Sequence, residues 1–226
     1  MFQQFKKNPK TYEHIEPNLV GNSRNIVVSD QAGKSNIISR LKSIGISFKE
    51  DDPKIKKLLE EVKDREFIGY SYDGADASFE LLARRIMGEI PRYISIKEYD
   101  VTVKKDSSGN IISSAKAKLE VDKKLILCEG EGNGPVHALD NAIRTNVDKL
   151  AKYSKFLKDL KLVDYKVRIL NTGTEAVTRV SIESTDSKGK NWFTIGVSPN
   201  IIEASFKALI DSLDYKLFKD NAPASN

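Results

Sequence analysis

The spacing of apolar residues along the chain changes near residue 90. Before it, apolar residues recur three or four positions apart, as on one face of a helix, whereas after it apolar and polar residues alternate, as in a half-buried strand. The pattern predicts helices first and strands later. We therefore expect an α+β fold with a helical linker subdomain over 1–90, a mostly stranded domain over 91–217 and a polar, frayed tail over 218–226.

Three helices are predicted in the first part. The first follows Asp30, a favourable capping residue, and is ended by Gly45. The second begins at Pro53, because proline at the first helical position costs no hydrogen bond. The third spans 73–85. The apolar faces of these helices are modest, so we expect the subdomain to depend on a packing partner.

One pattern occurs twice in the second part. Alternating stretches run to a glycine, a proline follows three residues later, and a helix with alanines four apart comes next. Glycine permits a sharp exit from a strand, proline suits the first helical position, and small alanines let a helix lie close to a sheet. The pattern predicts two βββα units. Their expected strands are 99–103, 115–121 and 125–131 and then 162–170, 176–184 and 192–197, with helices over 134–150 and 199–216.

Composition narrows the function classes. The chain has 226 residues with 39% apolar and 31% charged side chains, as is ordinary for a globular protein. Its 37 basic and 32 acidic residues are interleaved, which argues against a nucleic-acid surface. No apolar run approaches the roughly 20 residues that cross a bilayer. With no signal-peptide pattern and one cysteine, Cys128, we expect a cytoplasmic protein without a membrane partner.

Residues that usually carry catalysis are scarce. The chain has two histidines, His14 and His137, and no motif typical of a metal site, a nucleotide-binding loop or a nucleophile elbow. Cys128 lies in an apolar stretch and is interpreted as core. We therefore predict no metal site, no cofactor and no self-contained active site.

A family likeness is carried by segments 8–17, 20–22, 29–37 and 69–82, and then by 130–135, 164–170 and 196–205. These segments resemble the citramalate synthase branch of the isopropylmalate/homocitrate synthase family. The first four are similar to the part after its catalytic barrel, and the last three are similar to its C-terminal regulatory domain. The resemblance covers essentially the whole chain.

The resemblance implies an acyltransferase context. In the family a barrel that uses a divalent metal condenses acetyl-CoA with a 2-keto acid, pyruvate in this branch. That barrel would precede residue 1, and a catalytic histidine of the family falls at Met1. We therefore expect this chain to be inactive alone. Tyr12 matches a tyrosine that reaches the active site of the partner subunit, so its catalytic role requires a barrel.

The resemblance also implies that the βββα units form a homodimer and bind isoleucine or leucine as a feedback effector between protomers. A branched amino acid needs an aliphatic slot, and its carboxylate favours a helix N-terminus, which each repeat offers. From the residues alone, Val136, Leu162 and Ile169 would be interpreted as core. The positions that match the effector pocket are Val136, Leu162, Tyr165, Ile169, Ala176, Thr178, Ser198 and Pro199.

Two alternatives remain open. The first is the corresponding region of a leucine-regulated 2-isopropylmalate synthase, which segments 12–15 and 69–82 argue against and which tighter binding of leucine than of isoleucine would favour. The second is a stand-alone amino-acid-sensing subunit, if a separate protein supplies the barrel.

Overall fold

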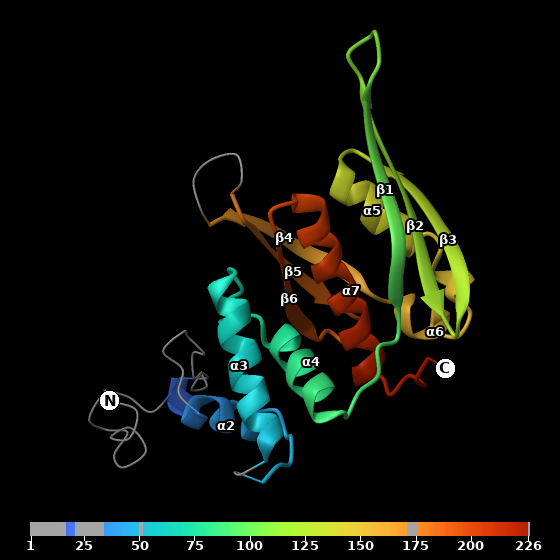
Figure 1. Ribbon diagram of the computed structural model, residues 1–226. Helices are drawn as coiled ribbons and strands as arrows, with labels where there is room; N and C mark the ends of the chain where they lie inside the picture. The colour runs from blue at the N-terminus through green and yellow to red at the C-terminus, as the bar shows by residue number, and fades with distance from the viewer. Residues whose placement is uncertain (1–16, 21–33, 50–51, 171–175, 226) are drawn as a thin grey trace.

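The computed structural model describes residues 17–20, 34–49, 52–170 and 176–225 (Figure 1). Tyr12 and the predicted cap Asp30 lie outside them. The helices are η2 (Pro17–Val20), α2 (Lys34–Ser43), α3 (Pro53–Phe67), α4 (Asp76–Met87), α5 (Pro135–Arg144), η3 (Val147–Leu150), α6 (Ser154–Leu157) and α7 (Ile201–Lys219), where η denotes a 3-10 helix. The strands are β1 (Ser95–Lys105), β2 (Ile111–Val121), β3 (Lys124–Gly132), β4 (Lys161–Ile169), β5 (Thr178–Thr185) and β6 (Asn191–Ser198).

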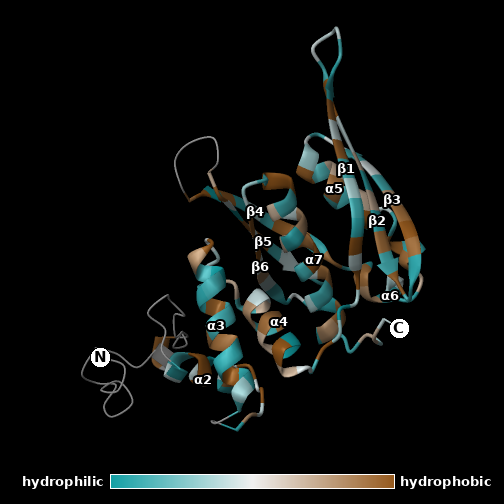
Figure 2. Ribbon diagram, viewed as in Figure 1, coloured by the Kyte–Doolittle hydropathy of each residue, from teal (hydrophilic) through white to brown (hydrophobic). Residues whose placement is uncertain are grey.

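The predicted α+β fold, a helical segment followed by two βββα units, is confirmed. Each unit forms its own antiparallel sheet, in the order β1-β2-β3 and β4-β5-β6. The repetition extends to local geometry, because each first strand has an irregularity two residues from its start, between Ile96 and Glu98 and between Leu162 and Asp164. The strands carry apolar and polar residues in turn, as Figure 2 shows for β1 to β3.

Each long helix of the repeat lies directly against its own sheet. Helix α5 packs on β2 and β3, and α7 packs on β5 and β6. A methyl group built on Gly130 would overlap the backbone of Ala142, and one on Gly196 would overlap the carbonyl oxygen of Ala204. Neither glycine has a positive φ. Gly132, the glycine expected to turn the chain in the first copy, is similar, since a methyl group there would overlap the backbone of Ala138 and its φ is not positive. Gly132 and Gly196 therefore serve close helix–sheet contact, and a turn in the left-handed region is not their role.

The two helices of the repeat begin differently. Helix α5 starts as predicted, with Gly134 at the N-cap and Pro135 as its first residue. In the second copy the N-cap is Asn200, so Pro199 precedes the helix and the predicted proline start is wrong there. The side chain of Asn200 accepts from the N–H groups of Ile202 and Glu203, which sets the start of the helix at Ile201.

Helix α5 is shorter than predicted. It ends at Arg144, because the side-chain amide of Asn146 donates to the carbonyl of Ala142 and also to that of Glu129 on β3. Helix α7 is longer than predicted and continues to Lys219.

The helical segment packs on the second unit. Its core, formed by α2, α3 and α4, also includes Ile195 of β6. Helix α4 lies against β6 and α7 (Figure 1). The packing partner expected for these helices is therefore the second βββα unit.

The C-terminal tail docks on the first unit. Ala222 is buried, the hydroxyl of Tyr153 donates to the carbonyl of Pro223 at 3.1 Å, and the N–H of Asp122 donates to Ser225 Oγ at 2.7 Å. The prediction of a frayed tail is wrong, because it considered polarity alone.

Candidate functional site: an apolar strip and a charged cavity

Five of the eight predicted effector residues lie on one face of the second sheet. Ile169, Thr178 and Ser198 form one row across the three strands. Leu162 lies opposite Ser184, and Tyr165 lies opposite Ile182. Directly opposed residues of antiparallel strands share a face. This is the face that α7 covers, since Ile182 packs with residues of α7.

Burial on this face falls along β4. Leu162 and Tyr165 pack against the cluster that contains Ala204 and Ala208 of α7, and the hydroxyl of Tyr165 lies 2.8 Å from Ser205 Oγ. Beyond them Val167 is 42% exposed and Ile169 is 67% exposed. We call Tyr165, Val167 and Ile169 the β4 strip. It is aliphatic, half covered by α7 and open at one end.

The sequence prediction missed Val167. It lies opposite Val180, on the same face as its neighbours in the strip. Two-residue alternation from Tyr165 to Ile169 was the signal that could have found it.

The other predicted effector residues lie apart from the strip. Val136 is the second residue of α5, in the other unit, and is half-buried. Ala176 is half-buried just before β5, and Pro199 is exposed just before the N-cap of α7. Thr178, within the row, is buried.

The two helix starts offer different opportunities to a carboxylate. At α7 the Asn200 side chain accepts from the N–H groups of Ile202 at 2.8 Å and Glu203 at 3.3 Å. At α5 the N-cap is Gly134 and no side chain caps the helix. Open N–H groups at a helix N-terminus favour an anion. The start of α5, beside Val136, is therefore the more favourable of the two positions for a carboxylate.

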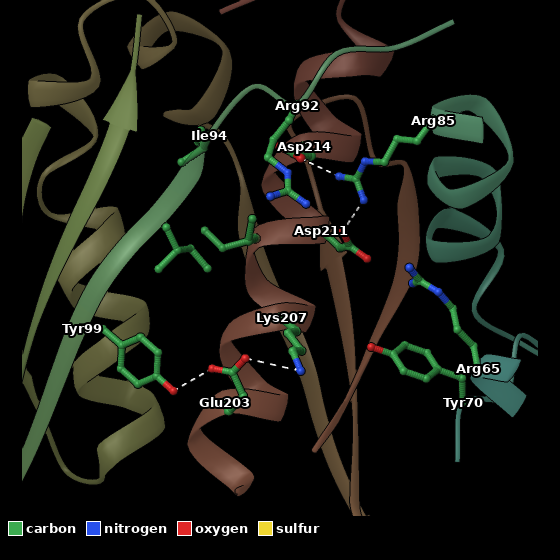
Figure 3. Close-up of a pocket in the computed structure, with 12 residues that line it drawn as sticks. Arg65, Tyr70, Arg85, Arg92, Ile94, Tyr99, Glu203, Lys207, Asp211 and Asp214 are labelled. Carbon is green, nitrogen blue, oxygen red and sulfur yellow. Dashed lines mark hydrogen bonds and ion pairs between the residues drawn. The ribbon is translucent and has the colours of Figure 1, made fainter. Parts of the chain in front are cut away.

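A cavity of about 420 Å³ opens where the helical segment meets the two units, and Figure 3 shows its lining. None of the predicted effector residues lines it. Helix α7 contributes the stripe Glu203, Lys207, Asp211 and Asp214. We call it the α7 cavity.

The inner end of the α7 cavity holds a buried charge cluster. Arg85 of α4 donates to Asp214 at 2.6 Å and to Asp211 at 3.0 Å. Burial raises the pKa of Asp214 to about 7, although the charge of Arg85 opposes the shift. Within the described chain, Asp214 Oδ1 and Arg85 Nε are buried without a hydrogen-bond partner. Such atoms are uncommon and call for an explanation.

A second cavity, of about 440 Å³, lies on the opposite face of the second sheet. Its charged lining residues are three basic side chains, Lys166, Arg168 and Arg179, and one carboxylate, Asp73. Arg179 Nε donates to the carbonyl of Gly69 at 2.6 Å, which ties this face to the segment between α3 and α4.

Neither a metal site nor a membrane span is found in the described ranges. No group of three or more His, Cys, Asp or Glu side chains there is placed to hold a metal ion. No helix in the same part of the chain is long and apolar enough to cross a bilayer.

Tandem βββα units behind a helical segment define the class of this chain, and family models match both parts of it. Residues 73–217, from just before α4 to near the end of α7, match the LeuA allosteric (dimerisation) domain, and residues 3–67 match the homocitrate synthase post-HMGL domain-like family. The chain belongs to the LeuA allosteric (dimerisation) domain family.

Its relatives agree with the branch inferred from the sequence. The chain is 47% identical over 217 residues to an (R)-citramalate synthase of Aquifex aeolicus, which is 95% of this chain and 40% of that protein. It is 42% identical over 217 residues to an (R)-citramalate synthase of Geobacter sulfurreducens, with the same coverage. The chain thus spans about two fifths of the length of the curated relatives it matches. The resemblance to the regulatory part of the citramalate branch is confirmed.

Proposed function

We propose that this chain is the regulatory region of a citramalate synthase-like acyltransferase. It pairs two subunits and binds a branched-chain amino acid that inhibits the condensation of acetyl-CoA with pyruvate in isoleucine biosynthesis. The match to an allosteric dimerisation domain and the names of the relatives support this proposal. In this proposal the barrel, with its divalent metal, catalyses the condensation, and this chain regulates it.

The β4 strip is the observation that carries the proposal. It exposes Val167 and Ile169 at the end of a face that α7 otherwise covers. Covering such a surface with an aliphatic group is favourable by roughly 25 cal/mol for each Å² of apolar surface removed from water. The side chain of isoleucine or leucine has this chemistry, and a second copy of the chain would close the slot.

The effector's carboxylate takes the open start of α5. Val136 is the second residue of that helix, and Gly134 leaves its first N–H groups without a side-chain cap. The α7 start is already capped by Asn200. The effector therefore joins the first unit to the strip of a second unit, which couples effector binding to dimer formation.

Calorimetry on the purified chain with isoleucine, leucine and valine tests the proposal. We expect isoleucine to bind most tightly and Ile169→Asp to abolish the heat. Ile111→Asp on β2 is the matched control, because Ile111 is similarly exposed at 59% but lies on the other sheet. Neither heat nor a thermal shift with any of the three amino acids would refute effector binding.

The same measurements decide between the alternatives. Tighter binding of leucine than of isoleucine favours the region of a 2-isopropylmalate synthase. Recovery of a separate barrel protein bound to this chain favours a stand-alone sensing subunit. Tyr12 lies outside the described residues, and its contribution to a partner's active site stays a prediction.

A further inference from the structure

The α7 cavity lies between residues of the 65–99 region and helix α7, which comes more than 100 residues later in the chain. Arg65 lies in the last turn of α3, and Tyr70 follows that helix. Arg85 lies on α4, and Arg92 and Ile94 lie just before β1 (Figure 3). Ile96 and Tyr99 of β1 together with helix α7 form the remaining wall. The volume of about 420 Å³ falls within the roughly 300–1,000 Å³ of ordinary small-molecule sites.

Most of the charged side chains in the lining already have partners. Four basic side chains, Arg65, Arg85, Arg92 and Lys207, face three carboxylates. Arg85 is engaged by two of those carboxylates, and Lys207 is paired with the third, Glu203, at 3.3 Å. Arg65 is bonded to Glu61.

Arg92 is the basic group that remains available. It is exposed, and no hydrogen bond or ion pair joins it to a residue that the structure describes, although its positive charge opposes the rise in the pKa of Asp214. A guanidinium group is suited to a carboxylate, which it can bind through two parallel hydrogen bonds.

The inner end of the cavity suits a ligand group that both donates and accepts a hydrogen bond. Asp214 Oδ1 is a buried acceptor without a partner and Arg85 Nε is a buried donor without a partner, and both belong to one ion pair. A hydroxyl can donate to the first and accept from the second, whereas an ammonium group can only donate. Arg92 lies beside Asp214 at this same end (Figure 3), and the lining also includes the apolar side chains of Ile94, Ile96 and Ile210.

We propose that the α7 cavity is a binding site for a small aliphatic 2-hydroxycarboxylate. The carboxylate pairs with Arg92, the aliphatic part lies against the three isoleucines, and the hydroxyl bridges Asp214 and Arg85. This site is separate from the β4 strip and does not rest on the function proposed for it. Its occupant would contact α4 and α7 together and so fix the helical segment on the second unit.

Three probes with one carbon skeleton test the assignment by calorimetry on the full chain. They are 2-hydroxy-3-methylbutyrate, 3-methylbutyrate, which lacks the hydroxyl, and valine, which carries an amine instead. We expect the hydroxy acid to bind at least about 10-fold more tightly than 3-methylbutyrate, as one hydrogen bond to a charged group provides. Equal affinity of these two acids would overturn the proposal, as would the absence of binding by the hydroxy acid.

Substitutions locate the site. Arg92→Gln should weaken binding of the hydroxy acid at least about 10-fold, whereas Lys104→Gln, which removes one positive charge from the distant β1–β2 hairpin, should not. Labelled methyl groups of Ile94, Ile96 and Ile210 should shift in NMR spectra. No effect of Arg92→Gln would overturn the proposal.

Ile169→Asp separates this site from the effector site. In that variant the hydroxy acid should still bind with unchanged affinity, while isoleucine no longer does. Loss of both would place the hydroxy acid on the β4 strip, overturning this inference and leaving the proposed function intact. Binding of valine more tightly than the hydroxy acid in the variant would also contradict it.

Discussion

Arg85 donates a 2.6 Å hydrogen bond to Asp214, and this bond joins helix α4 to helix α7. Asp214 is only 1% exposed, so its charge has little access to water. A buried carboxylate of this kind is tolerated only with a charged or hydrogen-bonded partner. The pair therefore fixes the helical segment on the second βββα unit.

Replacing Arg85 by methionine should lower the free energy of unfolding by about 3–5 kcal/mol at pH 8, because it leaves a buried charge unpaired. Urea denaturation measures the change. Arg168→Met on β4 is the control, since Arg168 is exposed and should change stability by less than about 0.5 kcal/mol. Similar losses in both variants would contradict the role given to Arg85.

Stability should depend on pH through Asp214. An aspartate titrates near pH 3.9 in an unfolded chain, and burial raises the pKa of Asp214 to about 7 in the folded one. Between about pH 4 and 7 the folded form binds more protons, so the contribution of this group falls as the pH rises. Asp214→Asn removes the titration, and its stability relative to the unchanged chain should increase from pH 5 to pH 8. A difference that stays constant would show that Asp214 keeps an ordinary pKa.

Gly196→Ala should destabilise the second unit by about 1–3 kcal/mol or more, because the new methyl group overlaps the carbonyl of Ala204. Gly134→Ala is the matched control, since open space surrounds that position and its φ of −160° suits any residue. Thermal unfolding compares the two. Equal stability would mean that α7 shifts away from its sheet without cost.

Removal of residues 221–226 should lower the free energy of unfolding by about 1–2 kcal/mol, as expected from the loss of two or so hydrogen bonds. The bonds in question join Tyr153 to Pro223 and Asp122 to Ser225. Tyr153→Phe should reproduce part of the loss. Unchanged stability of the shortened chain would indicate that the tail does not hold its docked position in solution.

Asn200→Ala should cost about 1 kcal/mol of stability, the usual value of a helix N-cap, and leave isoleucine affinity unchanged. The reason is that the carboxylate is assigned to the open start of α5. Calorimetry on the variant provides the measurement. A change in affinity comparable to that of Ile169→Asp would move the carboxylate to the start of α7.

The sequence predicts most of the fold because local signals specify it. The change of period near residue 90, the turns and the repeated glycine–proline–alanine spacing indicate all six strands and both long helices. The errors come from side chains that act at a distance. Asn146 ends α5 through a bond to β3, and the tail finds partners about 70 to 100 residues earlier in the chain.

The two candidate sites also differ in how far the sequence could predict them. The β4 strip could be predicted because its residues alternate along one strand, although Val136, Leu162 and Ile169 gained a functional interpretation only from the family resemblance. The α7 cavity could not be predicted. Arg85 and Asp214 are 129 residues apart, and no local pattern marks either as part of a site.

At Gly130 and Gly196 the backbone of a helix touches the backbone of its sheet, with no side chain between them. Contacts of this kind leave no layer of side chains that could deform between a helix and its own sheet. A movement of one helix against another has room instead where side chains pack between them, between α5 and α7 and between α4 and α7.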